Sequence, residues 1–252
     1  MRKTVTALLV AAIVGAGATA YADATYQTLP YSQNWTNIGL ITVSDDWSGV
    51  PGVIGYRGDD LTAVTAVDPQ TVVADAGVPA GLVVDVNANQ LNPNTFTSGG
   101  VCEFEIMDPT VAFQGSGTGD APSIVLHLNT SGFSSITVAY NLRDIDGSTD
   151  NAIQQVALQY RVGGGTGNYT NVPAGFVTDA STGPSLATLV TPVSVVLPTD
   201  ANNVTNVQVR IITTNAVGND EQIGIDDISV TGTTIPVAVE STEWTVIKGL
   251  YR

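Results

Sequence analysis

Alternation of apolar and polar residues with a period of two most strongly limits what this chain can fold into. The pattern is clearest at residues 136–142, 156–162 and 207–211, where Val, Ile, Leu and Tyr alternate with smaller or polar residues. Successive side chains of a β-strand point to opposite faces, so each stretch predicts a strand with one buried face. Gly- and Asn-rich turns separate the stretches, and no segment between residue 23 and residue 240 sustains a helical period.

The predicted fold is all-β, an antiparallel β-sandwich of jelly-roll type that spans residues 23–232. No repeat of fixed length indicates a propeller or a solenoid. Neither a dinucleotide-binding glycine motif nor a phosphate-binding loop is present, which excludes the nucleotide chemistry that depends on a strand followed by a helix.

The first 22 residues resemble a secretory signal peptide. Arg2 and Lys3 form a basic start, residues 7–18 are apolar and small, and small residues before residue 23 fit a cleavage site. The apolar run is too short for a membrane-spanning helix, which needs about 20 residues. We therefore expect a secreted or cell-surface protein with no membrane insertion after cleavage.

Residues 233–252 change character and predict a linker with a short C-terminal helical tail. Trp244, Ile247 and Leu250 would share one side of that helix. A sorting or attachment signal is one interpretation of the tail. A frayed helix that docks on the domain or lies in solvent is the other.

The charge balance excludes several partners. Lys and Arg together number 8 against 23 Asp and Glu, for a net charge of -15. Proteins bind nucleic acid largely through Lys and Arg that neutralise phosphates, so a nucleic-acid partner is excluded. Docking to an anionic membrane surface is excluded for the same reason.

His127 and Cys102 are the only histidine and the only cysteine. A catalytic triad would depend on His127, which alternation places away from the apolar face of its strand, and a zinc site needs more ligands of these types. Cys102 is predicted to be a buried thiol. We expect a non-catalytic protein, with a hydrolase that uses paired carboxylates as the weaker alternative.

An acidic cluster between two predicted strands is a candidate calcium site. Asp144, Asp146 and Asp150 offer the carboxylate oxygens that calcium prefers. Their spacing is not that of an EF-hand loop. Asp, Asn and Gly also form turns without a metal, so a solvated hairpin turn remains open.

Asp226 and Asp227 are the other candidate metal ligands, because the apolar alternation changes parity there. The change predicts either a β-bulge or a strand covered on both faces, with one carboxylate drawn inward. An inward carboxylate needs a cation. That cation would be calcium or one of the four arginines of the body: Arg57, Arg143, Arg161 and Arg210.

The segment Gly-Ile-Asp-Asp-Ile-Ser-Val at residues 224–230 resembles the final strand of jelly-roll modules in exported proteins. These modules include carbohydrate-binding modules and MAM adhesion domains. Residues 141–230 also resemble an uncharacterised bacterial module that accompanies extracellular nucleases and other secreted enzymes. The resemblance implies a β-sandwich that binds another molecule rather than transforming it.

The same resemblance implies a calcium ion that joins the last strand to the first strands of the domain. Asp226 or Asp227 would then pair with Glu103 or Glu105. Gln222 stands where the related module carries an aromatic residue, which counts against a stacking surface at that position.

Four aromatic residues in polar, turn-rich segments are candidates for stacking on sugar rings: Trp35, Trp47, Tyr56 and Tyr169. Core or edge packing is the alternative for each of them. We therefore expect a calcium-stabilised binding or adhesion module for an extracellular polysaccharide or a cell-surface glycan. The alternative is a structural extracellular component that self-associates through sheet edges or through the tail.

Overall fold

The computed structural model describes residues 22–75, 78–148, 152–165 and 167–236. The predicted signal peptide, apart from Ala22, the tail from residue 237 onward, and Asp150 lie outside the described residues. Within those four ranges no helix is long and apolar enough to cross a membrane.

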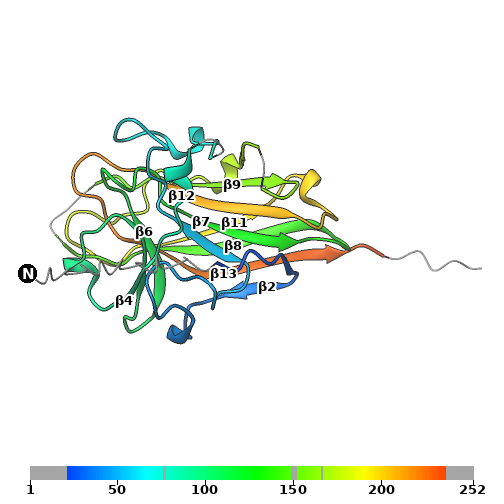
Figure 1. Ribbon diagram of the computed structural model, residues 1–252, viewed down its shortest axis with the longest axis horizontal. Coiled ribbons are helices and arrows are strands. Elements are labelled where there is room, and N and C mark those ends of the chain that lie inside the picture. The colour runs from blue at the N-terminus through cyan, green and yellow to red at the C-terminus, as the bar shows by residue number, and fades with distance from the viewer. Residues whose placement is uncertain (1–21, 76–77, 149–151, 166, 237–252) are drawn as a thin grey trace, which may run out of the picture.

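Two β-sheets pack face to face, which confirms the predicted β-sandwich (Figure 1). One sheet consists of β1 (Gln27–Thr28), β3 (Val53–Tyr56), β7 (Ser123–Asn129), β9 (Val156–Val162), β10 (Thr170–Asn171) and β12 (Val207–Thr213). The other consists of β2 (Tyr31–Gln33), β4 (Asn87–Gln90), β5 (Gly100–Phe104), β6 (Thr110–Gln114), β8 (Phe133–Asp144), β11 (Val190–Val196) and β13 (Ile223–Thr234). The six short 3-10 helices are η1 (Ile38–Leu40), η2 (Pro69–Thr71), η3 (Pro79–Leu82), η4 (Pro93–Thr95), η5 (Pro173–Gly175) and η6 (Thr199–Ala201).

The strand order shows how the chain passes between the sheets. The six-stranded sheet runs β1-β7-β12-β9-β10, with β3 also paired to β7, and the seven-stranded sheet runs β11-β8-β13-β6-β5-β4, with β2 also paired to β13. Pairing is antiparallel except for two short parallel contacts, β1 with β7 and β4 with β5, so both sheets are mixed. β13 extends to Thr234, past the predicted end of the domain at residue 232.

The core lies between the sheets and follows the alternation in the sequence. In β8, Ile136, Val138, Tyr140 and Leu142 are buried, while the residues between them are partly exposed. Their partners from the facing sheet include the equally alternating apolar residues of β9 and β12. Burial of these side chains supplies the main stabilisation, at roughly 25 cal/mol per Å² of apolar surface.

β13 contains a bulge at Asp226 and Asp227. Its register against β8 shifts between Asp226 and Ser229, and Asp227 has a φ of 51°. Before the bulge β13 pairs with β6, and after it with β2. The extra residue turns Ile228 and Val230 back into the core, which explains the parity change. Of the two predicted alternatives, the structure contains the bulge.

Asp226 is only 2% exposed and lies beneath Arg143. Arg143 Nη1 donates to Asp226 Oδ2 at 2.5 Å, and Arg143 Nη2 lies 3.2 Å from a carboxylate oxygen of Asp108. Burial raises the pKa of Asp226, while hydrogen bonds from Asp227 N and from Arg143 oppose that rise. The predicted cation is therefore Arg143, and the ion pair lies on the outer side of the sheet, where Arg143 alternates with the core residues of β8.

We expect Arg143→Met to lower the free energy of unfolding by about 3 kcal/mol, because it leaves a buried carboxylate without its counter-charge. Urea denaturation at neutral pH measures the loss. The control, Arg57→Met, removes a pair with Asp59 that is 3.8 Å long and more exposed, and should cost less than about 1 kcal/mol. Equal losses in the two variants would contradict a structural role for the Arg143 pair.

Candidate functional site

A polar groove opens at one end of the sandwich, where three connections cross between the sheets. They follow β6, β8 and β12, and their described residues are 115–122, 145–148 with 152–155, and 214–222. The groove has a volume of about 650 Å³. Its lining residues are mainly amides, hydroxyls and glycines: Thr65, Asn94, Thr97, Gln114, Gly115, Ser116, Gly117, Ser148, Asn215, Ala216, Val217, Gly218, Asn219 and Asp220.

Hydrogen bonds between buried polar groups hold the floor of the groove. Gln114 Nε2 donates to the Asp220 carbonyl at 2.6 Å, and Gln222 Nε2 donates to Gln114 Oε1 at 2.8 Å. Asp220 Oδ1 accepts from Ala216 N at 2.6 Å and closes the turn between them. Gln222 is fully buried, so it supports the floor and offers no surface for stacking.

Three buried carboxylates converge next to this groove. Asp144 ends β8, Asp146 follows it, and Glu221 precedes β13; one oxygen from each lies within 4.8 Å of the others. The three residues are 4%, 3% and 2% exposed, respectively. Calcium binds oxygens at about 2.3–2.6 Å, so the ligands of one ion lie within about 5 Å of each other. The spacing of this buried acidic cluster is compatible with three of the six to eight oxygen ligands of a calcium ion.

The sequence identified two of these three residues. Asp144 and Asp146 were expected ligands, and Asp150 lies outside the described residues. Glu221 was missed because it is far along the chain. Its position follows from the antiparallel register, which sets Ile223 opposite Asp144. The one feature of the sequence that could have indicated Glu221 is its position just before the strand β13.

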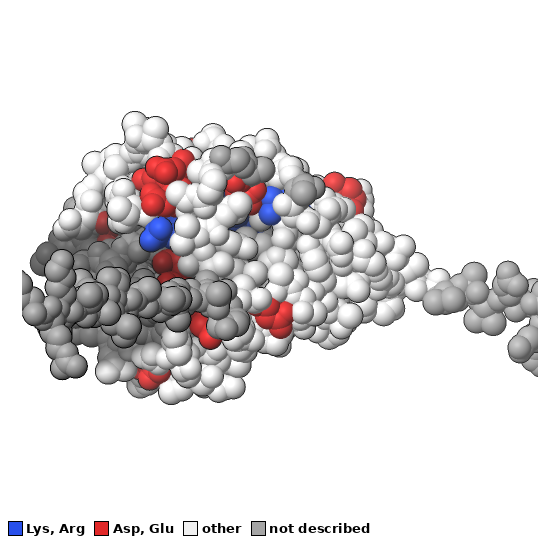
Figure 2. Space-filling model, in the orientation of Figure 1, with Lys and Arg blue, Asp and Glu red and all other residues white. Residues whose placement is uncertain are grey.

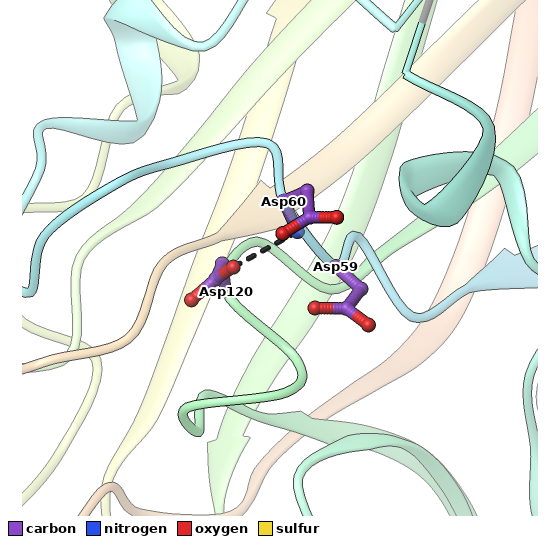
Figure 3. A group of neighbouring side chains, drawn as sticks. All are labelled: Asp59, Asp60 and Asp120. Atoms are coloured by element: carbon purple, nitrogen blue, oxygen red, sulfur yellow. Dashed lines mark hydrogen bonds between the residues drawn. The ribbon is translucent and has the colours of Figure 1, made fainter.

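A second, more exposed acidic cluster consists of Asp59, Asp60 and Asp120 (Figure 3). Asp59 and Asp60 follow β3 and Asp120 precedes β7, two strands that are neighbours in one sheet. Asp60 N donates to Asp120 Oδ2 at 2.9 Å, and Arg57 lies 3.8 Å from Asp59. Solvent and Arg57 offset charge here, because Asp60 is exposed and Asp59 and Asp120 are partly exposed.

The resemblance implied that Asp226 or Asp227 pairs with Glu103 or Glu105. This pairing is not found among the described residues, where neither of the two acidic clusters contains any of these four residues. Glu103 is opposite Val111, on the face of its sheet that points into the core, while Asp226 is on the outer face. The sheet itself separates the two carboxylates. Asp226 has Arg143 as its partner, so these two aspartates are not supported as metal ligands.

The expectation that Trp35 and Trp47 stack on sugars is wrong, because both indoles are in the core. They are 3% and 0% exposed and meet edge to face at 6.3 Å. Each indole N–H has a buried acceptor: Ile225 O at 2.7 Å for Trp35 and Asp85 O at 3.0 Å for Trp47. A satisfied N–H allows an indole to fill core volume without a polar penalty.

Tyr169 is also buried, so the expectation that its ring stacks on a sugar is wrong as well. It is 3% exposed, and the guanidinium carbons of Arg161 and Arg210 lie 4.1 and 3.9 Å from its ring centroid. Arg161 also pairs with Asp75 at 2.9 Å. Tyr56, at the end of β3, remains partly exposed but does not line the groove.

The groups considered for catalysis are buried. His127 is 3% exposed, and its Nε2 lies 2.8 Å from Gln208 Nε2. Cys102 is a buried free thiol, as predicted, and burial raises the pKa of that thiol. Figure 2 shows that charged side chains form small groups on the viewed face and that most of this surface is uncharged.

No family model matches this chain, and no curated protein sequence matches it. Among solved structures, it is similar to TmCBM61 in complex with beta-1,4-galactotriose (13% identity, 50% of this chain and 72% of the other, TM-score 0.32). It is similar to a non-crystalline cellulose specific carbohydrate-binding module, CBM28 (10%, 57% and 88%, TM-score 0.39). A cyclase from Fischerella sp. TAU is a further neighbour (9%, 74% and 87%, TM-score 0.38). Because these identities and TM-scores are low, we transfer none of these functions to the chain.

Glu103 gives the protein a pH-dependent contribution to stability. Burial raises the pKa of Glu103 from its ordinary value of 4.5 to about 7, although Asn89 N donates to its carboxylate at 2.6 Å. The folded state therefore holds a proton that the unfolded state releases. This stabilisation is fully present below about pH 4.5 and is lost as the pH rises through about 7.

We expect Glu103→Gln to reduce the loss of stability between about pH 5 and about pH 8. The glutamine oxygen keeps an acceptor for Asn89 N, while the titrating proton is removed. Urea denaturation of both proteins across this range measures the difference. Identical slopes for the two proteins would show that Glu103 does not titrate as its burial indicates.

Proposed function

We propose that this protein is a secreted, non-catalytic module that binds a glycan in the polar groove and is stabilised by calcium at the buried acidic cluster. The observation that carries the proposal is the lining of the groove. Amides and hydroxyls dominate it, and among the described residues Asp220 is the only one in the lining with a charged side chain. Neutral sugars present hydroxyls that both donate and accept, which is the chemistry that such side chains complement.

Several of these side chains have their hydrogen-bonding capacity available. Thr97, Asn215 and Asn219 make no side-chain hydrogen bond within the described part of the chain, and Thr97 and Asn219 are exposed. Each asparagine amide offers two donors and an acceptor. The floor beneath them is fixed by the buried glutamines, so a ligand would meet a largely pre-formed surface.

The groove supports binding better than hydrolysis. A glycosidase of the common type needs two carboxyl groups that flank the bond to be cleaved. Asp220 is buried and already accepts a hydrogen bond from Ala216 N. The neighbouring Asp144, Asp146 and Glu221 are buried as well, which suits a metal ion better than contact with a substrate.

Self-association through the β11 edge of the seven-stranded sheet receives less support. Leu197 N donates to Ile136 O and Asp144 N donates to Leu189 O, so the odd-numbered residues of β11 bond to β8. The backbone groups of the even-numbered residues, Pro192 included, face away from β8. Proline has no N–H to donate to a further strand, and it is typical of edges that resist pairing.

We expect calcium to raise the melting temperature of chelator-treated protein, because a ligand that binds only the folded state stabilises it by mass action. At calcium concentrations of about 100 times Kd the gain is about 2.7 kcal/mol. Glu221→Gln should remove most of the calcium-induced shift, as measured by differential scanning fluorimetry.

Asp59→Asn is the matched control for the calcium experiment and should keep the full shift. A shift lost in Asp59→Asn and kept in Glu221→Gln would move the ion to the cluster in Figure 3. No shift in the parent protein at roughly 1 mM calcium would contradict calcium binding. A site whose Kd exceeds that concentration would add little stability.

We expect the protein to bind a neutral oligosaccharide on a glycan array, and Asn219→Ala to weaken that binding about five- to tenfold. This loss corresponds to one hydrogen bond of about 1 to 1.5 kcal/mol. Titration calorimetry with the strongest array ligand measures it. Asn168→Ala, an exposed asparagine between β9 and β10 at the other end of the sandwich, is the control and should bind unchanged. Binding that is equal in both variants would place the ligand elsewhere.

A further inference from the structure

An apolar pocket adjoins the polar groove. It has a volume of about 360 Å³ and is lined by Ala66, Ile153, Gln155, Thr214, Ala216 and Val217. Ala216 and Val217 also line the groove, so the pocket and the groove lie next to each other. A single ligand that fills the groove can therefore extend a substituent into the pocket.

Two large aliphatic side chains are left in solvent at this pocket. Ile153 is 64% exposed and Val217 is 72% exposed. Covering such surface is favourable by roughly 0.8 kcal/mol per CH₂ group. The pocket wall is held in place, because Ala66 N donates to Asn215 O at 2.7 Å and Thr214 Oγ1 donates to Val67 O at 2.6 Å.

An amide side chain lies beside this apolar surface. Gln155 is partly exposed, and its side chain makes no hydrogen bond within the described residues. Its backbone carbonyl is fixed by Thr213 Oγ1 at 2.6 Å. The pocket thus offers an apolar surface next to an amide donor and acceptor. An acetamido group carries the complementary set: one methyl, one N–H and one C=O.

The charges around both cavities disfavour acidic sugars. Among the described residues, neither lining contains Lys or Arg, whereas Asp220 lies in the groove. A uronate or a sulfate would meet like charge with no cation from the lining to offset it.

We infer that the groove selects a neutral saccharide that carries an N-acetyl substituent, whose methyl group enters the apolar pocket between Ile153 and Val217. The sugar hydroxyls then contact the amides of the groove, and the acetamido N–H or C=O contacts Gln155. This inference rests on the proposed glycan-binding function and adds the class of sugar.

Matched oligosaccharide pairs that differ only in acetamido against hydroxyl groups test the inference with the full-length protein. N-acetylated chitotriose and cellotriose share one backbone, and N-acetylgalactosamine and galactose ends on a common core give a second pair. We expect the acetylated member of the preferred pair to bind about tenfold more tightly by titration calorimetry. That ratio corresponds to about 1.4 kcal/mol.

Variants locate the preference. Ile153→Ser and Val217→Ser should each reduce the ratio within the preferred pair at least about threefold. Ile153 lines only the pocket, so Ile153→Ser should also leave binding of the unacetylated member the same. Val196→Ser, an exposed valine of β11 at the opposite end of β8, should keep the full ratio.

The outcomes separate the two proposals. Binding to sugars with no preference for the acetylated member, or a preference for uronates, sulfated sugars or deoxy sugars, would overturn the inference and leave glycan binding intact. A preference that survives both pocket variants would also overturn it. Failure to bind any sugar of the pairs or of a broad array would overturn the proposed function itself.

Discussion

The fold depends on one strand, β13, that pairs with three others. It runs beside β8 for most of its length, pairs with β6 at its start and pairs with β2 after the bulge. A regular strand could not change its partner and keep Ile228 and Val230 in the core. The bulge makes both possible. It also buries the Asp226 carboxylate, whose charge is offset by the ion pair with Arg143.

Three of the four arginines of the body make structural contacts in mostly buried positions, whereas Arg57 is more exposed. Arg143 pairs with Asp226 and Asp108, and Arg161 pairs with Asp75. Arg210 is 2% exposed and donates to Gln159 and to the Val72 carbonyl, while its guanidinium covers the Tyr169 ring. Because these arginines make internal contacts, few positive charges remain on the described surface. This agrees with the groove, whose described lining contains no Lys or Arg.

The sequence predicted those features that depend on local periodicity. Alternation identified the core residues of β8. The parity change at Asp226 predicted either a bulge or a strand covered on both faces, and left calcium and an arginine open as the partner of its carboxylate. The sequence pattern could not place Glu221 beside Asp144, because only the register of β13 against β8 brings the two residues together. The aromatic expectations failed for a related reason: Trp35 and Trp47 lie in irregular segments, where no period distinguishes a buried ring from an exposed one.

The groove is built where three connections cross between the sheets, and none of its lining residues except Gln114 belongs to a strand. Loops tolerate insertion and substitution far better than paired strands do. Related chains can therefore diverge in groove width and ligand while the sandwich stays constant. In such a family, ligand preference would follow the lengths of these three crossovers, and similarity confined to the strands would be a poor guide to it.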